Sequence, residues 1–278
     1  MSFTLSAADV KNLRDTTGAG MMDCKAALTE AEGDFEKAIE ILRKKGQKLS
    51  IKRADREAKE GVVIAKVNDS KTKGVVVKVS SETDFVSKNE DFINTTKKIA
   101  DIALATFPSS LEALLQQNYE GSTSIGDKVT DMVAAIGEKI ELSNYETLEA
   151  AQVEFYIHMG NKAGVLVGLN KSGDQFTEAG KDVAMQIAAM KPIALDKTDV
   201  DSAVIAKEIE IGKEQARAEG KPEAMLEKIA LGKLEKFYKE STLLHQQFVK
   251  DGSHTISSYL KSIDKDLTVT GFKHVKLG

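Results

Sequence analysis

The residues of this chain best suited to metal binding or nucleophilic catalysis are widely separated in sequence. The chain has one cysteine, Cys24, and four histidines, which are His158, His245, His254 and His274. No two histidines are four residues apart, and none is close to the cysteine, so neither a zinc site nor a Cys–His nucleophile is indicated. We therefore expect no metal site.

The motifs of common nucleotide-binding and hydrolytic enzymes are also missing. The chain has neither a Gly-x-x-x-x-Gly-Lys-Ser/Thr phosphate loop nor a Gly-x-Ser-x-Gly nucleophile motif. Gly18-Ala19-Gly20 begins a dinucleotide fingerprint, but Asp23 stands where the third glycine belongs, and the run follows a predicted helix rather than a strand. We expect no enzymatic reaction and no cofactor.

The run Thr83-Asp84-Phe85-Val86 offers chemistry of another kind, because it places a large aromatic residue beside a carboxylate at a corner between a predicted strand and a predicted helix. One interpretation is structural, with Phe85 covering the local core and Asp84 capping the helix. The other is functional, with Phe85 as an exposed aromatic tip that anchors in a pocket of another protein. The pattern by itself leaves both open.

Charge and composition limit the partners and the location. The net charge is −4, whereas binding to a phosphate backbone needs a concentrated basic face, so we expect no direct nucleic-acid partner. No run of about 18 apolar residues is present, so no membrane span is expected. The first residues lack the basic and apolar regions of a signal peptide. A single cysteine fits a reducing compartment, and the expected location is cytoplasmic.

The first predicted part of the chain is a helical module at 1–46. A capping-box pattern at Ser6 and Asp9 starts the first of three short helices, and Asp34 can cap the third, which we expect to end at Gly46. Three helices in so short a segment predict a small, UBA-like bundle. Such a bundle is more often a docking module than a catalytic one.

A basic segment follows, and we interpret residues 47–60 as a linker. Its cations, with those that end the preceding helix, are Arg43, Lys44, Lys45, Lys48, Lys52, Arg53 and Arg56. The only acid between positions 43 and 56 is Asp55. A solvated helical linker explains this composition. The alternative is an RNA- or ribosome-associated scaffold that uses the 43–56 stretch, although no aromatic residue lies among the cations.

A β-hairpin followed by helices is predicted for residues 61–145. The runs at 61–67 and 74–79 are rich in β-branched residues and are separated by a polar turn, which is typical of a hairpin. A helix should begin at about Asn89, and another should span about 127–141. We interpret this segment as the first of two core subdomains.

The same pattern recurs in residues 146–278. Apolar runs at 153–158 and 164–169 predict a second hairpin, and a helix should follow at about 177–190. The recurrence indicates two related hairpin-plus-helix subdomains, and therefore an α+β fold.

An antiparallel helical hairpin is expected as an insertion in the second subdomain, at about 202–240. Gly220-Lys221-Pro222 supplies its turn, and Gly212 and Gly232 indicate a close approach of the two helices. A projecting hairpin buries little surface alone, so it should brace a partner, another copy of the chain or the body. A last strand is predicted at 267–275.

Two long motifs, in this order, resemble the bacterial elongation factor Ts family. The first is Thr17-Gly18-Ala19-Gly20-Met21-Met22-Asp23-Cys24-Lys25-Ala26-Ala27-Leu28, and the second is Thr83-Asp84-Phe85-Val86. Further agreement lies at 158–160, 164–167, 191–192, 220–222 and 269–272. The order of the parts agrees as well, and the resemblance covers most of the chain.

The resemblance implies a guanine-nucleotide exchange factor for elongation factor Tu, which would bind this partner in its GDP-bound and nucleotide-free states. In that family an Asp-Phe pair, here Asp84 and Phe85, intrudes between two helices beside the nucleotide site and disturbs magnesium coordination. Thr83 and Val86 would shape the corner that carries the pair.

The resemblance also implies contacts by Met21, Met22 and Lys25 of the helical module and by His158 and Gly160 of the core. Because the two methionines are adjacent, they cannot share one face of a helix. The structural alternative is therefore one buried and one exposed methionine, whereas exposed methionines would form an adaptable contact surface.

The helical hairpin and the C-terminal part of the second subdomain carry further implications of the resemblance. The helical hairpin would add partner contacts or, in some members, self-association. Some members continue past the strand near Phe272 with a helix that touches the partner. This chain stops at Gly278, so we expect that contact to be missing or replaced.

Overall fold

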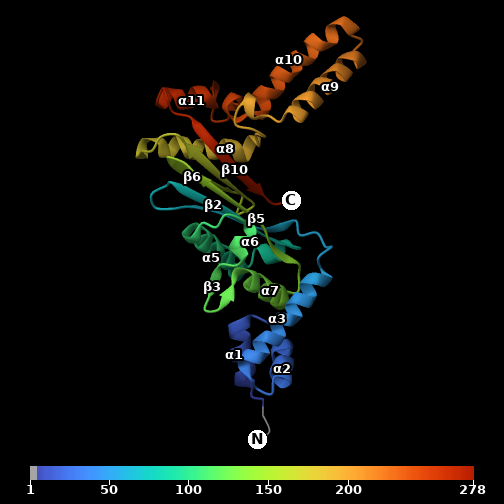
Figure 1. Cartoon of the computed structure of the whole chain (residues 1–278), viewed down its shortest axis with the longest axis vertical. Coiled ribbons are helices and arrows are strands. Elements are labelled where there is room, and N and C mark those ends of the chain that lie inside the picture. Colours follow the sequence, from blue (N-terminus) through green and yellow to red (C-terminus); the bar gives the residue numbers. More distant parts are fainter. Residues whose placement is uncertain (1–4) are drawn as a thin grey trace.

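The computed structural model describes residues 5–278 and arranges the chain as three parts along one long axis (Figure 1). Residues 1–4, the start of the segment compared above with a signal peptide, lie outside this description. A helical module at one end consists of α1 (Ala7–Thr17), α2 (Met21–Glu30) and α3 (Phe35–Lys52). The core lies in the middle, and a helical hairpin projects at the other end.

The helical module starts and packs as its sequence predicts. Ser6 and Asp9 form a complete capping box at the start of α1, and the side chain of Asp34 accepts a hydrogen bond from the backbone N–H of Lys37 in α3. Buried side chains from all three helices form its small core, including Leu13, Cys24, Leu28 and Leu42.

The third helix does not end at Gly46, as we expected, but continues to Lys52. Gly46 is buried where α3 crosses α7 (Ile125–Ile136), and a Cβ there would lie 2.6 Å from the carbonyl oxygen of Thr130. The glycine is thus required for close approach of two helices rather than for termination. One continuous helix therefore joins the module to the core.

The core is built on two three-stranded antiparallel sheets. In spatial order, the first contains β1 (Glu60–Val67), β2 (Lys73–Ser81) and β5 (Ile140–Glu149). The second contains β10 (Val269–Lys276), β7 (Ala163–Leu169) and β6 (Gln152–His158). Both predicted hairpins and the predicted last strand are confirmed, whereas β5 was not predicted.

The two sheets pack against each other through small and β-branched residues. Val63 and Val76 of the first sheet share a buried cluster with Val153 and Leu166 of the second. A Cβ on Gly74 would lie 2.8 Å from the side chain of Val153, so this glycine permits the close approach of the sheets. Sheet-on-sheet packing explains why these strands read as nearly continuous apolar runs.

Helices cover the outer face of each sheet (Figure 1). The first sheet is covered by α5 (Glu90–Thr106) and α7, and the second by α8 (Thr177–Met190) and α11 (Ile256–Ile263). The predicted helix at about 127–141 is too long. It ends at Gly137, which adopts a left-handed conformation with φ of 79°, and Ile140 opens β5 instead.

The internal repeat extends further than the sequence indicated. In each half, a two-stranded ribbon and a capped helix precede the third strand of the sheet. The ribbons are β3 (Asn118–Glu120) with β4 (Thr123–Ser124), and β8 (Gln247–Phe248) with β9 (Asp251–Thr255). Capping boxes at Ser124 and Thr255 start α7 and α11. The two subdomains therefore share one plan, which confirms the α+β prediction.

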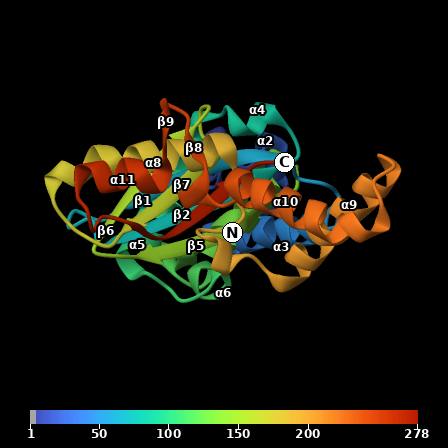
Figure 2. The same cartoon turned by 90° about the horizontal axis from the view of Figure 1, so that it is seen from above.

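The helical hairpin consists of α9 (Ser202–Ala218) and α10 (Glu223–Ser241) and extends away from the core (Figures 1 and 2). A Cβ on Gly212 would lie 3.1 Å from the Cα of Ala230, so the expected close approach is confirmed there. It is wrong at Gly232, where a Cβ would meet nothing within 4 Å.

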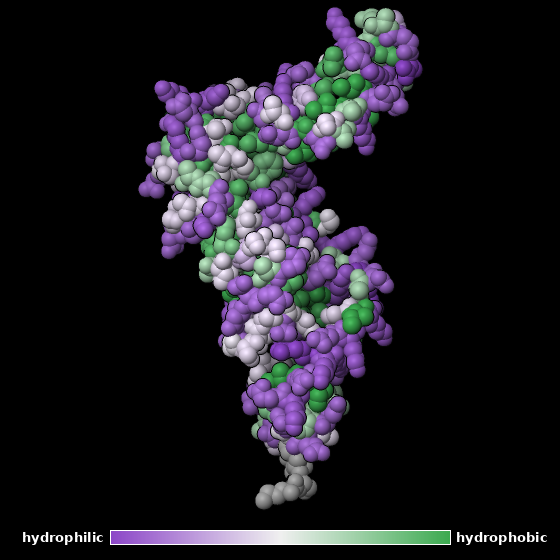
Figure 3. Space-filling view, viewed as in Figure 1, coloured by the Kyte–Doolittle hydropathy of each residue, from purple (hydrophilic) through white to green (hydrophobic). Residues whose placement is uncertain are grey.

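The exposed surface of the hairpin is not wholly polar. Figure 3 shows an apolar area on it, and its exposed large apolar side chains include Met225 and Leu231. Across residues 5–278, no helix combines the length and apolar character that crossing a membrane requires.

Candidate functional site

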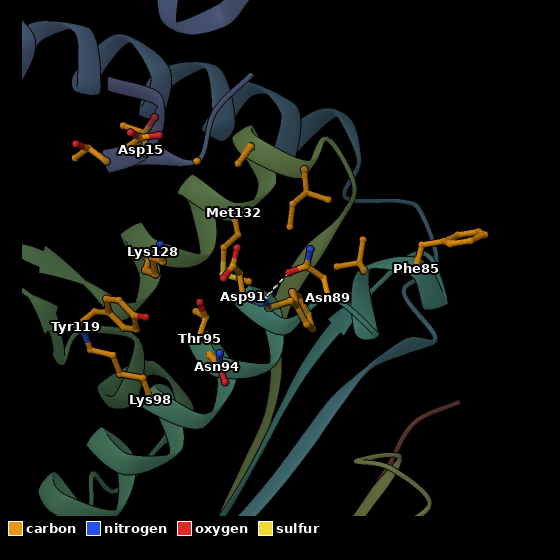
Figure 4. A pocket seen from close by; sticks show the side chains of 17 residues that line it. Asp15, Phe85, Asn89, Asp91, Asn94, Thr95, Lys98, Tyr119, Lys128 and Met132 are labelled. Carbon is orange, nitrogen blue, oxygen red and sulfur yellow. Dashed lines mark hydrogen bonds between the residues drawn. The ribbon is translucent and has the colours of Figure 1, made fainter. Parts of the chain in front are cut away.

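The Thr83–Val86 corner presents its aromatic residue to solvent. It follows β2 and contains the short helix α4 (Asp84–Ser87). Phe85 is 81% exposed, whereas Val86 is buried in the core of the first subdomain. Figure 4 shows the Phe85 ring directed away from the neighbouring elements. The interpretation in which Phe85 covers the local core is therefore wrong.

Asp84 does not cap the following helix either. The side chain of Asn89 performs that role for α5, accepting hydrogen bonds from the backbone N–H groups of Asp91 and Phe92 at 2.8 and 3.2 Å. The carboxylate of Asp84 lies 2.6 Å from the Lys88 ammonium, one helical turn away. The hydrogen bond from Lys88 holds the pKa of Asp84 below its usual value, so the corner carries an ionised carboxylate beside an exposed ring.

A groove of about 710 Å³ runs from this corner to the helical module (Figure 4). The C-terminal end of α1, with Asp15, lines one side, and Lys98 of α5 and Lys128 of α7 line another. Met132 and Ile136 supply apolar surface between them. The groove is therefore an apolar depression with a charged rim, which suits a helix or loop of another protein better than a small polar substrate.

Both methionines of the helical module are exposed. Met21 is 56% exposed and Met22 74%, so the alternative of one buried and one exposed methionine is wrong. The core-facing positions of α2 are taken by Cys24, Ala27 and Leu28. Lys25 is exposed as well, which makes the start of α2 an apolar surface with one cation.

The turn between β6 and β7 lies close to the same corner. His158 is partly buried and within 3.2 Å of the Tyr156 hydroxyl, whereas Gly160 is exposed. The backbone carbonyl of Asn161 accepts a hydrogen bond from Val63 of β1, which ties the turn to the first sheet. The charge of Lys162 contributes to the lowered pKa of Asp84. Lys162, two residues after Gly160, is thus near enough to Asp84 to act on it electrostatically.

The charges of the basic stretch are mostly used within the chain. Salt bridges within residues 5–278 join Arg43 to Asp131, Lys44 to Glu40, Lys45 to Asp23, and both Arg53 and Arg56 to Glu82. Cations that already pair with carboxylates present little free positive charge to a phosphate backbone. This pairing favours the linker interpretation over the RNA-binding one.

Two carboxylates beside the corner were missed by sequence reasoning. Glu82 receives Arg53 and Arg56, and Glu138 accepts two hydrogen bonds from Thr83. Glu138 is 55 residues away in sequence, and no local pattern signals such a contact. Within residues 5–278, no group of three or more His, Cys, Asp or Glu side chains is arranged to hold a metal ion.

Comparisons with known proteins agree with this architecture. The family model described as "Elongation factor TS" matches residues 82–278. The chain is 54% identical over 274 residues to elongation factor Ts of Christiangramia forsetii, with 99% of each chain covered. It is 51% identical over 275 residues to elongation factor Ts of Flavobacterium psychrophilum and 52% identical over 275 residues to that of Cytophaga hutchinsonii, again with 99% of each chain covered. This chain therefore belongs to the elongation factor Ts family.

Proposed function

We propose that this chain is a guanine-nucleotide exchange factor that docks on elongation factor Tu in protein synthesis and promotes GDP release. The observation that carries the proposal is the exposed Phe85 on a short, internally held corner, with the Asp84 carboxylate beside it. Single exposed aromatic residues are common on protein surfaces, but Phe85 is held on a corner at the edge of a groove, which is a suitable position for an anchor that enters a partner's pocket.

The proposed mechanism uses Phe85 as a wedge. The ring enters between two helices beside the nucleotide site of the partner, where it can repack apolar neighbours without needing hydrogen bonds. Asp84 enters with it, and the displacement disturbs coordination of the partner's magnesium ion. A magnesium ion held by the partner at the nucleotide phosphates would be the largest local charge there, so disturbing the groups that hold it would weaken GDP binding.

Thermodynamic linkage makes the effect on the two affinities reciprocal. If this chain lowers the affinity of the partner for GDP by a given ratio, GDP lowers the affinity of the partner for this chain by the same ratio. The chain therefore binds the GDP-bound and the nucleotide-free partner, with the tighter complex in the absence of nucleotide. No bond is made or broken by a side chain of this chain, so the proposed role is one of binding rather than enzymatic catalysis.

Two further surfaces would complete the docking. Met21, Met22 and Lys25 form an exposed apolar surface with one cation on the helical module, and exposed methionines adapt well to a partner's contour. His158, the last residue of β6, and Gly160, in the turn that follows it, would add a contact from the core. The groove between the module and the corner would receive a segment of the same partner. The helical hairpin would serve self-association or an additional contact, through exposed apolar residues such as Met225 and Leu231.

The test is release of fluorescent GDP from the cognate elongation factor Tu, followed by stopped flow. We expect the release rate to rise with the concentration of this chain and then to saturate. A rate that does not depend on this chain would refute the proposal. Repeating the titration at low and moderate salt separates the alternative, because RNA binding weakens steeply over that range whereas insertion of an apolar wedge does not.

A further inference from the structure

We infer that Glu138 and Glu82 are positioning residues that hold the Thr83–Val86 corner in the geometry that presents Phe85. The inference rests on the proposed function, but its first test below does not involve the partner. Neither carboxylate belongs to the Asp-Phe pair or to the groove. Both accept hydrogen bonds from other residues of the chain, at the base of the corner.

Glu138 accepts two hydrogen bonds from Thr83. One carboxylate oxygen accepts the backbone N–H of Thr83 at 3.0 Å, and the other accepts its hydroxyl at 2.7 Å. Glu138 lies in the turn between α7 and β5, so these hydrogen bonds join two segments of the first subdomain that are distant in sequence. Two bonds from one carboxylate to one residue fix both the backbone and the side chain of Thr83. Hydrogen bonds to an ionised acceptor are stronger than neutral ones.

Glu82 collects donors from two other segments. The guanidinium groups of Arg53 and Arg56 donate to it at 2.7 and 2.9 Å, and the backbone N–H of Lys139 donates at 2.6 Å. The Lys139 ammonium in turn donates to the carbonyl oxygens of Ala54 and Arg56. Burial alone would raise the pKa of Glu82, but these hydrogen bonds outweigh it and lower the pKa to about 2. The carboxylate is therefore ionised and occupied.

The corner needs this support because it has little of its own. The helix α4 has four residues, and Thr83, its N-cap residue, makes no side-chain capping bond to it. A helix of one turn is not stable by itself in water. Val86 is buried, and the remaining bonds of the corner to Ser81, Lys88 and Asn89 are local, so Glu138 and Glu82 supply its long-range hydrogen bonds. Loss of these bonds would let Phe85 sample positions in which it cannot enter the partner.

The network also joins the corner to the helical module. Arg53 directly follows α3, the last helix of the module. Glu138 comes one residue after Gly137, the C-cap of α7, and α3 packs on α7 through Gly46. The Met21–Met22 surface and the Phe85 ring therefore belong to one internally braced frame. A partner that must meet both surfaces at once gains from this bracing, because less ordering remains to be done on binding.

The first test measures amide hydrogen exchange in residues 82–88 without any partner. We expect Glu138→Ala to speed amide hydrogen exchange in this segment by about tenfold, because the segment can then open without breaking the two hydrogen bonds between Thr83 and Glu138. Glu149→Ala, a matched control at the exposed far end of β5, should leave it unchanged. Equal rates of amide hydrogen exchange in the Glu138 variant and the unmodified chain would overturn the inference, whatever the GDP-release assay with the partner shows.

The second test is a double-mutant cycle with Phe85 in the GDP-release assay. If only about a tenth of the molecules hold Phe85 correctly after Glu138→Ala, the concentration for half-maximal release rises about tenfold. In a Phe85→Ala background the same substitution should change it less than twofold, because there is no ring left to position. A general loss of stability would act equally in both backgrounds, and that result would overturn the inference.

A conservative variant keeps both tests decisive if alanine impairs folding. Glu138→Gln retains one acceptor oxygen for Thr83, so it should give an intermediate effect in both measurements. Glu82→Gln, which weakens the bonds to Arg53 and Arg56, should show the same dependence on Phe85. An effect of Glu138→Gln as large as that of alanine, with no dependence on Phe85, would count against positioning.

Discussion

Replacing Phe85 with alanine separates a docking residue from a core residue. A phenylalanine side chain can bury up to about 200 Å². Phe85 is 81% exposed, so the folded chain buries only about a fifth of that area. At about 25 cal/mol per Å², this amounts to about 1 kcal/mol of stability, whereas the area left for a partner corresponds to at most about 4 kcal/mol. We therefore expect Phe85→Ala to lower the free energy of unfolding by no more than about 1 kcal/mol.

The same substitution should slow GDP release from elongation factor Tu at least about tenfold, which corresponds to about 1.4 kcal/mol in the barrier. Asp84→Ala should act in the same direction but more weakly, since the carboxylate accompanies the wedge. Urea unfolding followed by circular dichroism and stopped-flow release can be measured on one preparation.

Phe92, seven residues further along, provides the matched control. It is 2% exposed and belongs to the core of the first subdomain, so Phe92→Ala should cost about 3–5 kcal/mol of stability. If Phe85→Ala destabilised the chain as much as Phe92→Ala, the ring would be a core residue. If Phe85→Ala left release unchanged at saturating concentration, the wedge mechanism would be refuted.

Three further predictions follow from the packing and charge of the elements around this corner. Because the folded-state pKa of Glu82 is lowered to about 2, its stabilising effect should be complete above its ordinary pKa of 4.5 and should fade as the pH falls from 4.5 toward 2. The difference in unfolding free energy between the unmodified chain and Glu82→Gln should shrink over that window, and a constant difference would contradict this. Gly46→Val should force α3 away from α7 at a cost of about 1–3 kcal/mol, measured by urea unfolding, and should weaken binding to elongation factor Tu, whereas Gly232→Val, at an open position, should do neither. Lys44→Glu with Lys48→Glu should change GDP release less than about twofold, because exposed charges on α3 contribute little; complete loss by a folded variant would assign this stretch to the docking surface.

The helices and strands with a strong local pattern could be predicted from the sequence. Capping residues and apolar spacing located α1, α5 and α8, and runs of β-branched residues located both hairpins of the core. The boundaries failed where a local signal had two meanings. Gly46 resembles a helix end but is a contact point between helices, and Ile140 continues the apolar spacing of α7 but begins β5. The spacing of apolar residues describes one face of a single helix or strand, and it does not indicate which other element packs against that face.

The candidate site divides in the same way. Local sequence pattern was enough to predict that Asp84 and Phe85 stand at a corner between a strand and a helix, and the motifs indicated the family. The exposure of Phe85, the groove between the corner and the helical module, and the hydrogen bonds from Thr83 to Glu138, 55 residues away, could be found only in the folded structure. Exposure and long-range hydrogen bonds depend on how elements pack together, because a side chain is buried or held by neighbours that are distant in sequence. Local pattern fixes the elements, and their packing fixes which side chains remain for a partner.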